Sequence, residues 1–311
     1  MHRMPQVLLY AVFWQSVGLG MTTSCVSFAP RLERCECGDG KVCELVEDGE
    51  PACFAPVEIR GQVFDLTDKS GVEGAHVVAL DHNGTAVTTF AVTDTAGNYR
   101  LAVPSTRYAD GTPIPAEMTL HVDAASHQSF PSSVRLASPI DSGIATPDGD
   151  TWVVASALTD VGLLALPSGS GNSSITGSVE LPETRTGILM VATSSEGVGF
   201  ASIADRDGEF HILNLPAGSY TVEAYAHGVS YKNASLALAT VSDAKVYLAL
   251  SNVATGTVSG TIQLVNAPAT AMTSVILAVE STFDESLARG ETVPGLRAPE
   301  PGLGCPPLAL G

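Results

Sequence analysis

Basic residues are scarce in this chain, and the shortage limits what it can bind. Lys and Arg number 15 against 33 Asp and Glu, which gives a net charge of −18 over 311 residues. Proteins that bind nucleic acid neutralise phosphates with Lys and Arg, and this composition cannot supply a run of them. We therefore expect no nucleic-acid partner. The acidic balance is typical of a soluble exterior protein and leaves room for divalent cations.

Common catalytic motifs are missing as well. No histidine opens an H-x-x-E or H-E-x-x-H pattern, and neither G-x-G-x-x-G nor a P-loop occurs. The nearest text to a G-x-S-x-G nucleophile elbow, PSGSG at 167–171, lacks the required spacing. Cys305 stands alone in a Pro/Gly-rich run and has no positioned partner. The sequence therefore predicts a protein that is not an enzyme.

Apolar runs long enough to cross a bilayer are also absent. VLLYAVFW at 7–14 is too short for a membrane span but suits the apolar region of a signal peptide. The following TTSC at 22–25 resembles a bacterial lipobox, although that motif usually has Leu where this chain has Thr22. We expect residues 1–24 to be a signal peptide and Cys25 to carry lipid, which would be the only attachment to a membrane. Plain signal-peptidase cleavage near Cys25 is the alternative.

Four of the six cysteines lie within 19 residues, namely Cys35, Cys37, Cys43 and Cys53. In an exported chain such a cluster favours disulfides over a metal site, and C-x-C does not supply the C-x2-C pair of a zinc site. Cys35 and Cys37 are too close to bridge each other comfortably. Two connectivities remain, 35–43 with 37–53 or 35–53 with 37–43. We expect segment 25–56 to be a disulfide-stapled spacer between anchor and body.

From residue 57 onward the chain is a succession of short β-type runs broken by Gly, Pro, Asp and Asn, with no helical period. A sequence motif recurs in this region: a G-x-V/I entry strand, a β-branched run, an Asp-x-x-Gly hairpin ending on Tyr99 or Phe210, and a closing L-x-L strand. Such repeats mark tandem modules of β-sandwich size. The sequence predicts an all-β protein with a first module at 57–167, a linker at 168–174 and a second module at 175–254.

The stretch DRDGEFHILNLPAGSYTVEAY at 205–225 contains the hairpin and closing strand of this motif in full. Asp205 can accept a backbone N–H and start a turn, and Gly208 supplies a residue with positive φ. Strand alternation then predicts Phe210 on the core face and His211 on the opposite face. PAGS makes a second turn, in which Gly218 is free to be left-handed. Every residue of the stretch therefore has a structural role.

Several segments resemble one known family. They are G-x-V-x-D at 61–65, G-A-x-V at 74–77, VTD-x-x-GNY at 92–99 and DRDGEF-x-I-x-NLPAGSYTV at 205–222. These segments resemble the carboxypeptidase regulatory-like domain, a transthyretin-like β-sandwich close in fold to starch-binding domains. The whole layout looks like a class of bacterial surface lipoproteins. The resemblance implies the fold and an accessory or binding role, and it implies no catalysis, since peptidases of that name carry their zinc site in a separate domain.

The sequence offers candidate binding residues for two ligands, carbohydrate and calcium. Kinship with starch-binding domains suggests carbohydrate on an aromatic platform, and Tyr225 and Tyr231, which flank the AHGVS loop, are the better exposed pair. Calcium is the one cofactor left open, because Asp205 and Asp207 flank a turn and hard cations prefer oxygen ligands. The EF-type loop is not completed, so turn formation is the favoured role of these aspartates.

A third copy opens at 260–264 and 273–281 but lacks the Asp-x-x-Gly turn and the closing strand. Half a sandwich cannot bury its apolar face. Either the chain is disordered from about 282, or the two strands dock onto module two, or the sequence is truncated or frame-changed near Pro301. We favour the last and expect an incomplete module at 255–311 with low order after 282.

These observations predict an exported, lipid-anchored protein of the outer membrane or cell surface, or otherwise a secreted one. Its modules are expected to form a structural or interaction scaffold, because exposed edge strands of sandwiches can pair with partners. The partner would be a cell-surface protein or a polysaccharide. Carbohydrate-binding modules are the first alternative, and accessory domains of a carboxypeptidase-type enzyme system are the second.

Overall fold

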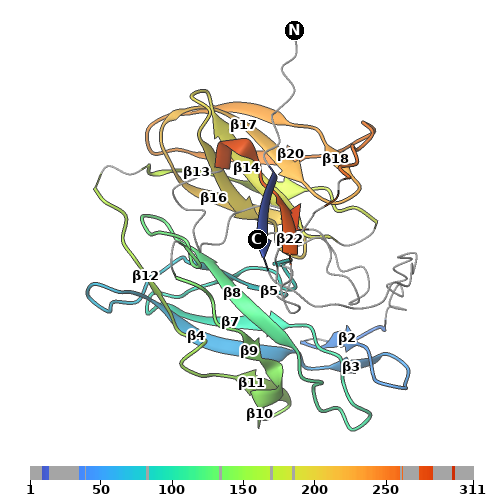
Figure 1. Cartoon of the computed structure of the whole chain (residues 1–311). Coiled ribbons are helices and arrows are strands. Elements are labelled where there is room, and N and C mark those ends of the chain that lie inside the picture. The colour runs from blue at the N-terminus through green and yellow to red at the C-terminus, as the bar shows by residue number, and fades with distance from the viewer. Residues whose placement is uncertain are drawn as a thin grey trace.

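The protein is nearly all β, as predicted (Figure 1). The computed structural model describes residues 35–38, 40–81, 84–132, 135–168, 171–183, 186–259, 261 and 273–282, together with strands at 9–13 and 296–297. Across these ranges the helices are two short 3-10 turns, η1 (Ser142–Ile144) and η2 (Glu280–Thr282). No helix in them has the length and apolar character to cross a bilayer.

Module one is a sandwich of two sheets. The first sheet contains β4 (Val57–Asp65), β7 (Asn98–Val103), β10 (Thr146–Asp148), β11 (Thr151–Val154) and β12 (Val161–Leu163). Its long central strand, β4, pairs antiparallel with β7 on one side and parallel with β11 and then β12 on the other. The second sheet has the order β6 (Ala91–Val92), β5 (His76–Leu80), β8 (Glu117–Asp123), β9 (Ile140–Asp141).

Module two repeats this layout. Its first sheet contains β13 (Ser173–Val179), β16 (Glu209–Leu215) and β20 (Asp243–Leu248), and its second sheet contains β14 (Leu189–Ser194), β15 (Gly199–Ile203), β17 (Gly218–Tyr225) and β19 (Ala234–Leu238). Central β13 pairs antiparallel with β16 and parallel with β20, as β4 does with β7 and β12. A small sheet joins β18 (Ser230–Tyr231) to β21 (Leu250–Ser251). The repeat read in the sequence is therefore also a repeat of strand topology.

Each module has its own core, built by strand alternation. In β7 the side chains of Tyr99, Leu101 and Val103 are buried while their neighbours are exposed. In β16 Phe210 is fully buried and His211 faces the opposite side, as expected. Burial of alternate side chains is the main favourable contribution to folding of such sheets, at about 25 cal/mol per Å² of apolar surface. The two cores are separate clusters, one from each module.

The Asp-x-x-Gly element is not a hairpin, which corrects the expectation from the sequence. In module one it joins β6 of the second sheet to β7 of the first, and in module two it joins β15 to β16 in the same way. The turn carries the chain across the edge of the sandwich, so the strands that flank it do not pair. Gly97 and Gly208 have φ of +78° and +86°, which confirms the left-handed glycine of this turn.

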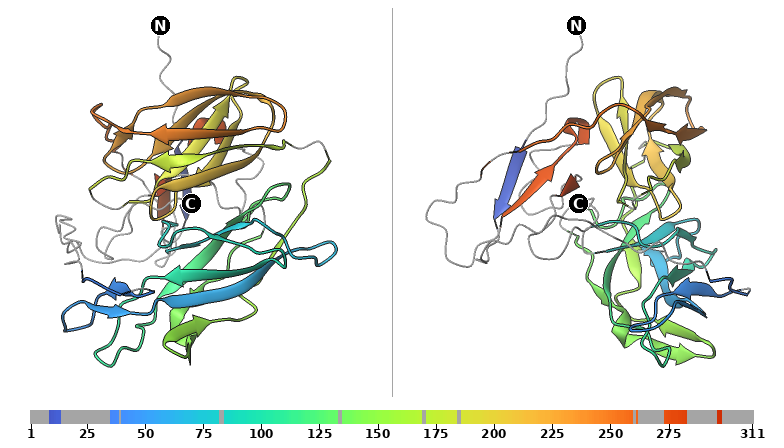
Figure 2. Two further views of the ribbon diagram at one scale, coloured as in Figure 1. Left: turned by 180° about the vertical axis from the view of Figure 1, so that it is seen from behind. Right: turned by 90° about the vertical axis from the view of Figure 1, so that its right-hand side faces the viewer.

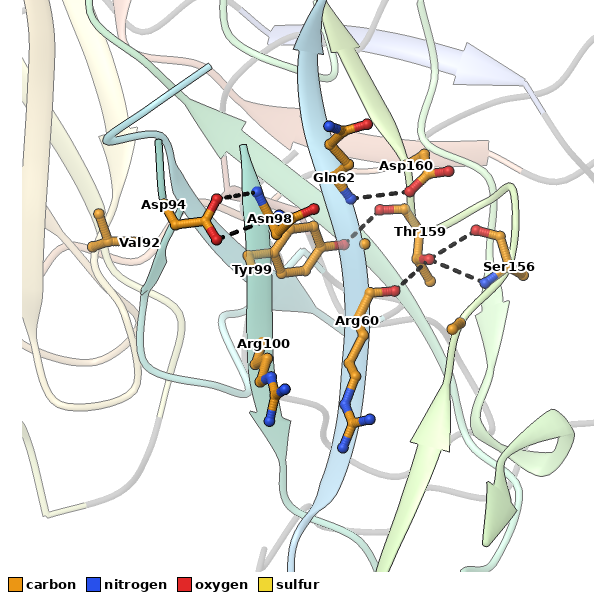
Figure 3. Close-up of a pocket in the computed structure, with 12 residues that line it drawn as sticks. Arg60, Gln62, Val92, Asp94, Asn98, Tyr99, Arg100, Ser156, Thr159 and Asp160 are labelled. Atoms are coloured by element: carbon orange, nitrogen blue, oxygen red, sulfur yellow. Dashed lines mark hydrogen bonds between the residues drawn. The ribbon is translucent and has the colours of Figure 1, made fainter. Parts of the chain in front are cut away.

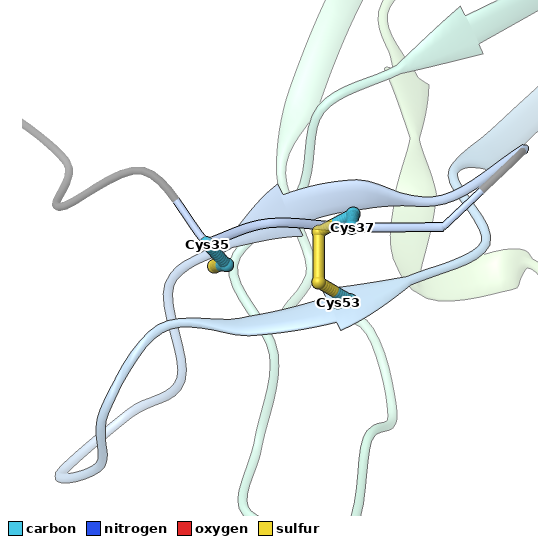
Figure 4. A group of neighbouring side chains, drawn as sticks. All are labelled: Cys35, Cys37 and Cys53. Atoms are coloured by element: carbon cyan, nitrogen blue, oxygen red, sulfur yellow. A yellow bond between two sulfur atoms is a disulfide. The ribbon is translucent and has the colours of Figure 1, made fainter.

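The N-terminal cysteines pair as Cys35–Cys43 and Cys37–Cys53, the first of the two connectivities considered. They staple the hairpin of β2 (Val42–Glu44) and β3 (Ala52–Phe54). Figure 4 shows the Cys37–Cys53 bond with Cys35 beside it. These three are the one cluster of metal-type ligands in the described part of the chain, and their sulfurs are used in disulfides.

The stapled hairpin is built onto module one rather than standing apart from it as a spacer. Arg107, in the connection from β7 to β8, donates through Nε to Glu44 Oε2 and through Nη2 to the Ala55 carbonyl at 2.8 Å. The Ser105 N–H donates to Glu44 Oε1 at 2.9 Å. Glu44 and Arg107 are only 2% and 1% exposed. Burial raises the pKa of Glu44 against the opposing hydrogen bonds from Arg107 and Ser105.

Residues 279–281, at the end of the third copy, contact module two. Of its first strand, 260–264, the structure describes Thr261 alone, so the choice among the three alternatives stays a prediction. Ser281 Oγ lies 3.0 Å from Thr193 Oγ1, and Val279 packs against Leu189 and Val191 on the outer face of β14. The preceding strand β22 (Thr273–Leu277) pairs with β1 (Leu9–Phe13) and with β23 (Leu296–Arg297).

Strands β1 and β22 lie side by side at one flank of the molecule (Figure 2). Strand β1 falls within segment 1–24, for which a signal peptide stays a prediction. Apart from β23, the region after 282 lies outside the described residues. So do Cys25 and Pro301.

We expect Arg107→Met to destabilise the protein by about 3 kcal/mol, because it leaves the Glu44 carboxylate buried without its partner. Chemical denaturation followed by tryptophan fluorescence would measure the loss. The matched control is Arg60→Met, which removes a partly exposed Arg paired with Glu58 and Asp148 and should cost below about 1 kcal/mol. Equal losses in the two variants would show that the buried pair does not hold the hairpin in place.

Candidate functional site

The turn 205–208 of module two reaches across to module one. Asp205 Oδ2 accepts a hydrogen bond of 3.0 Å from the Phe90 N–H. The adjacent Arg206 N–H donates to the Thr88 carbonyl at 2.9 Å. Both partners lie in the connection from β5 to β6 of module one. The turn at 205–208, which connects the two sheets of module two, therefore also joins module two to module one.

The carboxylate of Asp205 is occupied by backbone donors. Its Oδ1 accepts from the N–H groups of Asp207 and Glu209, both at 2.9 Å, while Oδ2 accepts from Phe90. Burial raises the pKa of Asp205, and these three hydrogen bonds lower it in part. Asp207 is exposed, and no cluster of metal-type ligands among the described residues includes either aspartate. The geometry is that of a turn, and calcium binding stays a prediction.

A second contact comes from Asn214 near the end of β16. Its Nδ2 donates to the carbonyls of Ala124 and His127 at 3.1 and 2.9 Å, and its Oδ1 accepts from the Ser126 N–H at 2.6 Å. One side chain thus makes three hydrogen bonds to the turn that follows β8 of module one. Asn214 has φ of +60° and is therefore left-handed. Gly218 of the PAGS turn is not left-handed, which corrects the expectation from the sequence.

The third contact is a stack of two imidazoles. His211 of β16 lies on His76 of β5 with ring centroids 3.8 Å apart and ring planes inclined by 25°. Phe90 packs edge-on against both rings. Burial lowers the pKa of His76, and burial together with the charge of His76 lowers the pKa of His211 to about 4. Both rings are therefore neutral at neutral pH.

The outward position of His211 on its strand was predicted from the sequence, but the residues of module one that it contacts were not. The contact residues that were not predicted are Thr88, Phe90, Ser126, His76 and Asn214. The one signal for them was Asn214, a polar residue with αL tendency near the end of an otherwise apolar strand. The others depend on how two separate modules come together.

The expected pair of exposed tyrosines is not exposed, which corrects that interpretation. Tyr225 and Tyr231 are both half-buried. Tyr225 packs against Leu189 and Val191, and its hydroxyl donates to Glu223 Oε2 at 2.9 Å. Tyr231 packs against the main core of module two, and its hydroxyl is buried. The two rings belong to different clusters and do not share one platform.

A polar groove lies instead on module one, where the pairing of β4 is interrupted between β11 and β12. The loop 155–160 fills the gap: the Gln62 N–H donates to Asp160 Oδ1 at 2.9 Å, and the Thr159 hydroxyl donates to the Arg60 carbonyl at 2.7 Å. Gly61 permits this approach, since a Cβ there would collide with the Thr159 carbonyl.

The groove has a volume of about 860 Å³ and is open to solvent (Figure 3). Arg60 and Arg100 are directly opposite each other across β4 and β7. Arg60 bonds Glu58 and Asp148, whereas Arg100 is exposed. The remaining lining is rich in side chains that donate and accept hydrogen bonds: Gln62, Asp94, Asn98, Ser156, Thr159 and Asp160.

Comparison with known proteins assigns no family. No family model and no curated protein matches the chain. Among solved structures, the shaft pilin SpaA of Lactobacillus rhamnosus GG is 11% identical with a TM-score of 0.22, over 64% of this chain and 99% of that one. The minor pilin of Streptococcus agalactiae is 11% identical with a TM-score of 0.21, over 66% and 100%. Likeness at this level assigns neither family nor activity, and the carboxypeptidase regulatory-like resemblance stays a prediction.

We expect Asp205→Ala to uncouple the two modules, because it removes both the turn and the bond to Phe90. Scanning calorimetry should show one transition for the wild type and two for the variant, with a loss of about 1–3 kcal/mol. Asn214→Gly, which keeps the left-handed backbone and removes three side-chain bonds, should act in the same direction.

The matched control is Asp94→Ala in the equivalent turn of module one. The Asp94 carboxylate accepts from the N–H groups of Ala96 and Asn98 and makes none of the bonds between modules. It should lower the transition temperature without dividing the transition. A divided transition in this control, or an undivided one in Asp205→Ala, would contradict the role given to Asp205.

Proposed function

We propose that the chain is a non-catalytic, exported scaffold of the cell surface in which both sandwich modules and the N-terminal hairpin form one rigid unit. The observation that carries the proposal is the joint, where a turn carboxylate, an asparagine and a ring stack fix module two on module one. A scaffold that holds a partner at a set distance needs such a fixed joint, because modules joined only by a linker move independently.

Sequence features supply the location in this proposal. The signal-like segment 1–24 directs export, and Cys25 attaches the chain to a membrane through lipid. The two disulfides suit an oxidising compartment outside the cytosol. The partner of the scaffold is a cell-surface protein or a polysaccharide.

Carbohydrate binding is the second candidate, and the groove of module one is the observation that favours it. Sugars are held through hydroxyl groups that both donate and accept hydrogen bonds, and the groove presents amide, hydroxyl, carboxylate and guanidinium groups on rigid strands. In this second proposal the sugar site lies around Arg100 and Asn98, on the opposite module from Tyr225 and Tyr231.

Display on the cell surface can be tested with Cys25→Ala. The wild type should remain with washed cells and be removed by protease added outside them, and it should incorporate a fatty-acid label. Cys25→Ala should lose the label and appear in the medium, whereas Cys305→Ala, the control for a cysteine outside the stapled hairpin, should behave as the wild type. Retention of an unlabelled wild-type protein inside the cells would refute surface display.

A binding screen of the purified protein against cell-wall and storage polysaccharides distinguishes the two candidate functions. If module one binds sugar, Arg100→Ala should weaken binding about tenfold, a loss typical of one charged hydrogen-bonding group. Tyr225→Ala would serve as the comparison on module two. Absence of saturable binding by the wild type would remove the carbohydrate candidate and leave the scaffold.

A further inference from the structure

The two modules meet face to face through a pair of titratable rings. His76 and His211 stack at 3.8 Å with Phe90 against their edges, and His76 Nδ1 is buried with no hydrogen-bond partner among the residues that the structure describes. Neutral imidazoles tolerate this contact. Protonation would place a charged N–H donor in a buried position and bring two like charges together, and both changes oppose docking.

We propose that the stacked imidazoles of His76 and His211 are an acid-sensitive latch, which holds module two on module one near neutral pH and releases it as the rings take up protons. The latch acts on the joint and goes beyond the scaffold role, since it makes the rigidity of the unit conditional on pH. It rests on the position of the rings: one ring comes from each module, so charging them pushes the modules apart.

The charged groups around the stack set the direction of the effect. Asp123 of β8 lies directly across from His76, and its negative charge acts to raise the pKa of both rings. Its carboxylate is already bonded to His121 Nε2 at 2.8 Å. Burial lowers the pKa of His121, but the charge and the hydrogen bond of Asp123 raise it by more, so the net shift is upward. The positive charge that this favours on His121 partly neutralises the Asp123 carboxylate.

The sign follows from comparing docked and separated states. In the docked structure, burial and the charge of His76 lower the pKa of His211 from its ordinary 6.5 to about 4. A ring that regains its ordinary pKa on separation takes up a proton between these limits, so the docked state binds fewer protons there. Docking is therefore strongest above pH 6.5 and weakens as the pH falls toward about 4. For His211 alone, the equilibrium constant for opening should rise roughly 30-fold between about pH 7.5 and about pH 5.

Asp205 works in the opposite direction and must be separated from the histidines. Burial raises its pKa, so acid relieves part of the cost of burying its charge at the joint. Arg206 and Asp207 flank it on the same turn. A variant that changes only the ring nitrogens is therefore the informative one.

Amide hydrogen exchange of the full chain measures opening directly. The N–H groups of Phe90 and Arg206 are bonded across the joint, whereas the Val122 N–H is bonded to Phe130 within module one. After correction for intrinsic exchange rates, protection of Phe90 and Arg206 should fall roughly 30-fold from about pH 7.5 to about pH 5. Val122 should stay unchanged.

His211→Phe keeps an aromatic ring in the stack and removes the proton. It should retain protection of Phe90 and Arg206 at both pH values, while His227→Phe, an exposed residue of the β17–β18 turn, should behave as the wild type. If His211→Phe does not fold, His76→Phe tests the same contact from module one. Small-angle scattering should show expansion of the wild type in acid and none in the ring variant.

Three results would overturn the latch. One is equal protection of the wild-type joint at both pH values. Another is an unchanged pH dependence in His211→Phe. The third is an NMR titration in which His211 takes up its proton near its ordinary pKa of 6.5, since docking would then not oppose its charge.

Discussion

The arrangement of the two modules depends on one buried carboxylate, Asp205, whose two oxygens serve different parts of the molecule. Oδ1 closes the turn that carries module two from one sheet to the other, and Oδ2 accepts the Phe90 N–H of module one. A buried carboxylate is tolerable only while it is hydrogen-bonded, because leaving it unpaired costs several kcal/mol. Local turn formation and docking of the modules are therefore coupled through the same side chain.

The same rule operates at the other end of module one. There Glu44 and Arg107 are buried together, and two further guanidinium N–H groups donate to the carbonyls of Ala55 and Gly111. The disulfides make the hairpin compact, but this pair holds it on the sandwich. Hairpin, module one and module two are thus joined at each step by a buried charged group that is satisfied across the boundary. This continuity of buried polar contacts supports the view of the protein as one rigid unit.

Much of the fold was predictable because it depends on local chemistry. Alternation predicted the burial of Phe210 and the outward face of His211, and the left-handed glycine predicted the turn at Gly208. Interpreting that turn as a hairpin was wrong, since a turn that crosses between sheets has the same local pattern as one that joins paired strands. The tyrosines were misjudged for a similar reason: a flanking position does not say which neighbour will cover a ring.

The sequence by itself determined the secondary structure, the repeat, the disulfide-bonded segment and the scarcity of cationic surface, because each follows from residue type and spacing along the chain. Only the tertiary structure decided which outward-facing residues meet. His76 and His211 are 135 positions apart, and Asn214 and Ser126 are 88 apart. Contacts between two folded modules depend on the shape of both surfaces at once, and no periodicity within either module encodes them.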